Sequence, residues 1–125
     1  MDTPSIFISY RRSDSASIAG RISDHLANAF GSDIFLDVES LYSGQDWVNT
    51  IEQRIRQSDA VIVIIGLQWL AALDSSGTPR LWNPIDPVRR ELEFANHYQK
   101  LIIPVCINGA PIPSASQLPE SLLFL

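Results

Sequence analysis

The sequence predicts a single α/β domain in which a parallel β-sheet is flanked by helices. Short apolar runs typical of strands alternate with longer segments whose apolar residues recur at helical spacing. This β-α-β-α-β-α-β order is typical of parallel sheets with right-handed crossovers. The chain has 125 residues, a usual length for one domain, and 46% of them are hydrophobic, which is enough to build a core.

The first half of the chain predicts two strands, each followed by a helix. The strands are Ser5–Ser9 and residues 33–37. The first helix covers residues 15–30 and stops at Gly31, because glycine readily ends a helix. The second helix begins after Asp46, its expected N-cap.

The second half predicts two more strands around a third helix. Ala60–Ile65 is apolar at every position, so we expect a central strand that is covered on both faces. Residues 73–85 form a long irregular stretch, and residues 86–98 form the helix. The last strand covers residues 101–107, where Pro104 predicts a break or the edge of the sheet.

Charge and cysteine content narrow the function classes. The net charge of −5 disfavours nucleic-acid binding as the main role of this domain. A single cysteine, Cys106, rules out an internal disulfide and favours a reducing, cytoplasmic location. His25 and His97 have no cysteine or carboxylate cluster at metal-binding spacing, so we expect no metal. No apolar run is long enough to span a membrane.

The chain ends on an apolar tetrapeptide, residues 122–125. At a free end, these side chains would be exposed or would start a strand that has no continuation. We therefore expect residues 1–125 to be one domain at the N-terminal part of a longer protein.

Glu91 lies where a helix should be apolar. Asp86 caps the predicted helix and Pro87 occupies its first position. At about 100° per residue, Glu91 falls in the middle of the apolar arc. That arc consists of Val88, Leu92, Phe94, Ala95 and Tyr98. An inward carboxylate must be paired, protonated or catalytic. The alternative is a buried ion pair or a residue at the rim of the arc.

Polar and charged residues follow the strands, where parallel sheets bind ligands. Arg11 and Arg12 come directly after the first strand, and adjacent guanidinium groups suit phosphate or carboxylate recognition. The alternative is a solvated loop with local ion pairs to Asp14 or Asp37.

Aromatic residues near the long irregular stretch are further candidates. Trp69 and Trp82 flank it, and an indole there could stack on a nucleobase or a nicotinamide ring. For any single tryptophan, simple core packing is the better interpretation.

Several motifs are absent from the sequence. It has no glycine-rich phosphate loop and no nucleophile elbow, and Ser9 has no evident histidine partner. A phospho-accepting receiver domain would need an aspartate where this chain has Gly66 at the end of the third strand.

Four segments resemble TIR (Toll/interleukin-1 receptor) domains along nearly the whole chain. They are Phe-Ile-Ser-Tyr-Arg-Arg at 7–12, Asp-Val-Glu at 37–39, Gly44, and the strand at 59–66. The similarity is greater to bacterial TIR domains and to the NAD-cleaving TIR domain of animal axon degeneration than to receptor adaptors. It implies a flavodoxin-like fold and, for the enzymatic branch, cleavage of the nicotinamide–ribose bond of NAD⁺.

The resemblance also implies roles for single residues. The position of the catalytic glutamate is Glu91, and residues 39–47 match the BB loop, which gates the site and mediates contacts between TIR domains. The expected substrate-binding residues are Tyr10, Arg11, Arg12, Asp37, Tyr42, Trp47 and Trp82. The chain departs from its enzymatic relatives at Pro87, where they often have tryptophan, and at Tyr42, where the animal enzyme has an acidic residue. The aromatic residue of the BB loop is Trp47 here, which is displaced by one position.

The expected function is therefore that of an NAD⁺ glycohydrolase that releases nicotinamide and ADP-ribose or a cyclic isomer. NAD⁺ is the substrate, and no cofactor is needed. The resemblance implies an effector of bacterial anti-phage immunity that is activated by oligomer or filament formation with other TIR domains. The alternative is a non-enzymatic TIR scaffold or adaptor. No contact with membranes or nucleic acid is expected.

Overall fold

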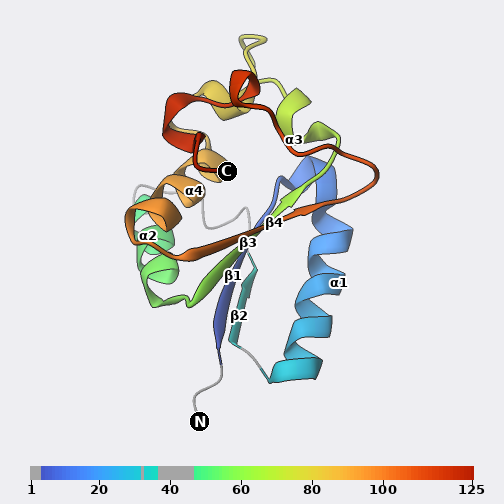
Figure 1. The fold of residues 1–125 in the computed structure, drawn as a ribbon, viewed down its shortest axis with the longest axis vertical. Coiled ribbons are helices and arrows are strands. Elements are labelled where there is room, and N and C mark those ends of the chain that lie inside the picture. Colours follow the sequence, from blue (N-terminus) through green and yellow to red (C-terminus); the bar gives the residue numbers. More distant parts are fainter. Residues whose placement is uncertain (1–3, 32, 37–46) are drawn as a thin grey trace.

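The computed structural model describes residues 4–31, 33–36 and 47–125, apart from the side chain of Phe30. Four parallel strands form one sheet with the order β2-β1-β3-β4 (Figure 1). The strands are β1 (Ser5–Ser9), β2 (Asp33–Leu36), β3 (Ala60–Ile65) and β4 (Leu101–Cys106). The predicted α/β fold with a parallel, helix-flanked sheet is confirmed.

Strand β3 is the central strand that its sequence predicts. Phe7 of β1 lies opposite Val61 on one side, and Ile102 of β4 lies opposite the same residue on the other. From Val61 to Ile65 the strand is buried, because helices cover both faces of the sheet. Such a strand has no polar face, which explains its uninterrupted apolar sequence.

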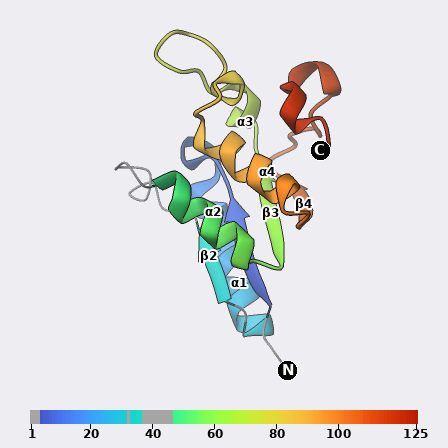
Figure 2. The same ribbon diagram turned by 90° about the vertical axis from the view of Figure 1, so that its left-hand side faces the viewer.

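The helices lie on two faces of the sheet (Figures 1 and 2). They are α1 (Arg12–Phe30), α2 (Trp47–Gln57), α3 (Gln68–Ala71) and α4 (Pro87–His97). Alternate residues of β1 divide between the faces. Phe7 packs with residues of α2 and α4, whereas Ile8 packs with residues of α1. Ser9 therefore lies on the same side as α4.

Helix α1 begins at Arg12, three residues before the predicted start. Its first turn is separated from the rest by Ser15, whose φ of −147° and ψ of 23° are not helical. The predicted stop is confirmed. Gly31 is left-handed with a φ of 58°, and its N–H donates to the Ala27 carbonyl at 2.9 Å. The early first turn matters because it carries Asp14.

The stretch over residues 73–85 is more ordered than the sequence predicts. Leu73 and Pro79 form an antiparallel bridge that closes a turn around Asp74. A 3-10 helix, η2 (Arg80–Trp82), then leads into α4.

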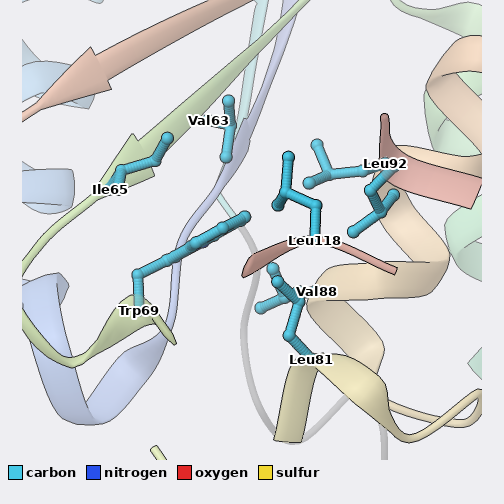
Figure 3. Packing of buried hydrophobic residues seen from close by; sticks show 8 residues of the cluster. Val63, Ile65, Trp69, Leu81, Val88, Leu92 and Leu118 are labelled. Carbon is cyan, nitrogen blue, oxygen red and sulfur yellow. The ribbon is translucent and has the colours of Figure 1, made fainter. Parts of the chain in front are cut away.

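A buried apolar cluster joins the carboxyl end of β3 to α4 (Figure 3). Its members are Val63, Ile65, Trp69, Leu81, Val88, Leu92, Leu118 and Leu122. The ring of Trp69 is fully buried and extends from α3 toward Leu118 (Figure 3). Trp69 is therefore a core residue, which is the simpler of its two interpretations.

The C-terminal segment contains two 3-10 helices, η3 (Ala115–Gln117) and η4 (Glu120–Leu122), and packs on this cluster through Leu118 and Leu122. Leu122 is fully buried and Leu125 is partly buried, whereas Leu123 remains 50% exposed. The final tetrapeptide differs from expectation, because it turns half of its side chains into the core and starts no strand.

Strand β4 is the edge strand that Pro104 predicts, since proline cannot donate a ladder hydrogen bond. Over the described ranges, the helices lack the combination of length and apolarity that crossing a bilayer requires.

Candidate active site

Glu91 lies on the buried face of α4 with no exposed surface. The buried residues of this helix are Val88, Glu91, Leu92 and Ala95. The helix starts as predicted, since the Asp86 carboxylate accepts the Arg89 N–H at 3.3 Å and Pro87 occupies the first turn. The inward position predicted for Glu91 is therefore confirmed, and the rim position is excluded.

Ser9, the last residue of β1, contacts this carboxylate. Its hydroxyl donates to Oε1 of Glu91 at 2.6 Å, and neither residue is exposed. This distance lies at the short end of the usual range for a hydrogen bond between a hydroxyl and an oxygen acceptor. The sequence does not predict this pair, because helical periodicity indicates that Glu91 faces inward but not which residue it meets.

Arg11 forms a second contact between the end of β1 and α4. Its two terminal nitrogens donate to the two oxygens of Asp86 at 3.0 Å each, and its Nε donates to the Trp69 carbonyl at 3.3 Å. Arg11 is 1% exposed, and Arg80 places a further cation 3.8 Å from Asp86. The guanidinium is thus held inside the protein rather than in a solvated loop, and among the described residues its carboxylate partner is Asp86 rather than Asp14.

Asp14 instead closes the end of β3. Its carboxylate accepts the backbone N–H groups of Gly66 and Gln68, each at 2.9 Å. A side chain on Gly66 would collide with this carboxylate. Gly66 at the end of β3 thus lies against an acidic side chain from α1.

The other predicted substrate residues lie in different surroundings. Tyr10 is half-buried and packs with the cluster under α1, on the face of the sheet opposite Glu91. Arg12 is exposed at the start of α1. Trp47 is half-buried and packs with the cluster that contains Phe7.

Trp82 is 45% exposed in η2. Its carbonyl accepts from Arg89 Nη1 at 3.1 Å, which ties η2 to α4. Asp37, Tyr42 and the predicted N-cap Asp46 lie outside the described residues, as does the loop over 39–46.

In the part of the chain that the structure describes, two cavities border α4. A groove of about 530 Å³ is lined by Glu52, Arg90, Glu93, Phe94, Asn96, His97 and Ser121. A smaller cavity of about 180 Å³ lies at the start of the helix and includes Arg80 and Asp86. Glu91 lines neither of them. Among the described residues, no three histidine, cysteine, aspartate or glutamate side chains are grouped to hold a metal ion.

Comparison with known proteins gives a consistent assignment. The protein-family model of the TIR domain matches residues 6–124. A protein of Drosophila melanogaster named NAD(+) hydrolase sarm1 is 28% identical over 120 residues, which are 96% of this chain and 8% of that protein. The chain thus spans a small part of this relative.

Two solved structures share the fold. A prokaryotic SEFIR domain has a TM-score of 0.62 and 21% identity, with 96% of this chain and 82% of that chain covered. A 2-deoxyribosyltransferase from Bacillus psychrosaccharolyticus has a TM-score of 0.56 and 16% identity, with 87% and 77% covered. At these identities, the likeness concerns the fold alone.

Proposed function

The chain belongs to the TIR domain family, and we propose that it is an NAD⁺ glycohydrolase with Glu91 as its catalytic carboxylate. The observation that carries this proposal is the full burial of Glu91 on α4, with the Ser9 hydroxyl 2.6 Å from its carboxylate. Burying a carboxylate is costly, and such groups are concentrated at functional sites. The similarity to a protein named NAD(+) hydrolase supports the same substrate for this chain.

One carboxylate is sufficient for this reaction. Most glycosidases need a second carboxyl group to protonate the leaving group. The nicotinamide of NAD⁺ is already cationic and departs as a neutral molecule with the electron pair of the C1′–N bond. Positive charge then develops on the ribose, and a carboxylate in a water-poor site stabilises it strongly. We assign this role to Glu91.

The reaction is completed by attack on C1′. When water attacks and loses a proton, NAD⁺ and water yield nicotinamide, ADP-ribose and a proton. When a nitrogen of the adenine base attacks instead, the product is a cyclic isomer of ADP-ribose. The relative placement of water and base decides between these outcomes.

For substrate binding, we propose that the exposed Arg12 contacts the pyrophosphate and that Trp47 or Trp82 stacks on a ring. The sequence predicts that Arg11 shares the pyrophosphate, but its guanidinium is already enclosed between Asp86 and the Trp69 carbonyl. Tyr10, Asp37 and Tyr42 remain predicted substrate residues. The stacking residue would be identified by a rise in KM when it is replaced by alanine.

We further propose that assembly with other TIR domains, through residues 39–47, activates the enzyme. Glu91 has no exposed surface, so NAD⁺ can reach it only after neighbouring side chains move. Contacts between copies would supply the free energy for this change. The biological role that we propose is that of an effector in bacterial anti-phage immunity, which is inactive until it oligomerises.

The same burial favours a second candidate, a TIR scaffold that recruits partner domains without catalysis. In this case Glu91 would only join α4 to β1. Product analysis separates the two candidates. Concentrated protein is incubated with NAD⁺ under conditions that promote assembly, and nicotinamide and ADP-ribose products are separated by chromatography. If the chain is an NAD⁺ glycohydrolase, the wild type should form these products and Glu91→Ala should form none. Assembled wild-type protein that releases no nicotinamide would favour the scaffold.

A further inference from the structure

We infer that the buried Arg11–Asp86 ion pair positions Glu91 relative to the end of β1. This inference rests on the proposed function, because Glu91 is the residue being positioned. Arg11 and Asp86 are then positioning residues, which act on the reaction through the placement of α4.

The geometry of the contacts supports this role. The end of β1 holds α4 at two points, through Ser9 with Glu91 and through Arg11 with Asp86. Two residues of extended chain span about 7 Å. Five residues of helix rise about 7.5 Å. The two attachments therefore have matching spacing, from Ser9 to the extended Arg11 on one side and from Glu91 to the N-cap Asp86 on the other. Together they fix the position of α4 relative to the end of β1.

The Arg11 contact is also directional. Its planar guanidinium pairs both oxygens of Asp86 while its Nε donates to the Trp69 carbonyl, so three contacts set its orientation. The same carboxylate caps α4 by accepting the Arg89 N–H. Because one carboxylate serves both functions, a shift of the ion pair shifts the start of the helix.

Stability alone is a poor explanation for this pair. Arg11 and Asp86 are almost fully buried, and a buried ion pair is often no more stabilising than apolar residues of similar volume. A bidentate pair does, however, restrict geometry far more than an apolar contact does. Catalysis requires such restriction, because a misplacement of about 1 Å can cost about a hundredfold in rate.

The test compares conservative variants with matched controls on the same helix. Arg11→Lys keeps the positive charge but loses the planar guanidinium that donates to both oxygens of Asp86. Asp86→Asn keeps an N-capping side chain but loses the negative charge. Each variant should be folded, as shown by a cooperative unfolding transition. Its kcat should be at least about tenfold below that of the wild type, with KM unchanged. Arg90→Lys and Glu93→Gln, which alter α4 on its outer side, should leave kcat and KM unchanged.

A folded Arg11→Lys protein with the wild-type kcat would overturn the inference, as would a variant that changes KM alone. If the single variants fail to fold, the double variant Arg11→Met with Asp86→Asn removes both charges together. It should fold and show the same loss of kcat, and a double variant with wild-type kcat would equally overturn the inference.

A readout that needs no activity separates failure of this inference from failure of the proposed function. Arg11 and Asp86 are not hydrogen-bonded to Glu91, yet the inference predicts that Arg11→Lys shifts the carbon NMR resonance of the Glu91 carboxyl. Arg90→Lys should leave that resonance in place. An unshifted resonance in Arg11→Lys contradicts the positioning role. Wild-type protein that releases no nicotinamide contradicts only the proposed function.

Discussion

Ser9 and Glu91 join the end of β1 to α4 through a hydrogen bond of 2.6 Å between the serine hydroxyl and the carboxylate. The two residues are 82 positions apart in the sequence, and each is fully buried. The sheet thus supplies a donor to an acidic group on the helix that covers it. This contact orients the carboxylate that we propose as the catalyst.

Replacing Ser9 by alanine should lower kcat for nicotinamide release by about tenfold to a hundredfold. A hydrogen bond to a charged group contributes about 1.5–3 kcal/mol, and about 1.4 kcal/mol corresponds to a tenfold change in rate. The matched control is Ser58→Ala, which removes another buried serine hydroxyl that donates to the Arg54 carbonyl at 2.7 Å. Equal rates for Ser9→Ala and Ser58→Ala would contradict the orienting role.

Replacing Gly66 by alanine should destabilise the fold by about 1–3 kcal/mol, because overpacking a closed site forces its neighbours to move. The added methyl group would meet the Asp14 carboxylate, which accepts the N–H groups of Gly66 and Gln68. Urea unfolding measures the change in the free energy of unfolding.

The control for this variant is Gly20→Ala in α1, where an added methyl group meets no atom within 4 Å. Alanine is favoured over glycine inside helices by up to about 1 kcal/mol. Gly20→Ala should therefore be as stable as the wild type or more so. If the two variants unfolded at the same urea concentration, the Asp14 carboxylate would not be packed against Gly66 at the end of β3.

Replacing Leu122 by alanine should cost about 2–5 kcal/mol, since its side chain is fully buried beside Trp69 and Leu118. The neighbouring Leu123 is 50% exposed, so Leu123→Ala should change the free energy of unfolding by less than about 0.5 kcal/mol. Thermal or urea unfolding of the two variants tests whether the C-terminal segment belongs to the core. Similar stability of the two would show that it does not.

The phenol of Tyr98 should titrate at unusually high pH. Its hydroxyl donates to the Glu52 carboxylate at 2.8 Å, and this hydrogen bond raises the pKa of Tyr98 above the ordinary 10.0. The contribution of the hydrogen bond to stability is present below pH 10.0 and is lost as the pH rises through the raised pKa. Ultraviolet titration detects the phenolate, and Tyr98→Phe identifies the transition. Glu52→Gln should lower its midpoint, and an unchanged midpoint would exclude Glu52 as the cause.

The sequence predicts the fold well because the strands are short apolar runs and the three long helices have most of their length marked by apolar residues at helical spacing. The same periodicity places Glu91 on the inner side of α4, and the structure confirms that position. Periodicity says which way a side chain faces, but it does not say which residue of another element it meets. For this reason the contact of Glu91 with Ser9 was not predicted.

Arg11 is a second residue whose contact partner the sequence does not identify. Its charge and its place after β1 suggested a ligand or a local ion pair, yet its partner Asp86 lies 75 residues away. Similarly, the first turn of α1 has no apolar signal in the sequence. It forms where Asp14 binds the backbone at the end of β3, which is a tertiary contact.

The most direct test of the central claim is nicotinamide release by Glu91→Gln under conditions that promote assembly. Glutamine keeps the shape of glutamate and removes the charge that would stabilise the ribose cation. The control is Glu93→Gln on the same helix, a half-buried glutamate that pairs with Arg89 at 3.0 Å. We predict that Glu91→Gln lowers the rate by at least about a hundredfold, while Glu93→Gln keeps the wild-type rate. Wild-type release of nicotinamide by Glu91→Gln would contradict the assignment of Glu91 as the catalyst.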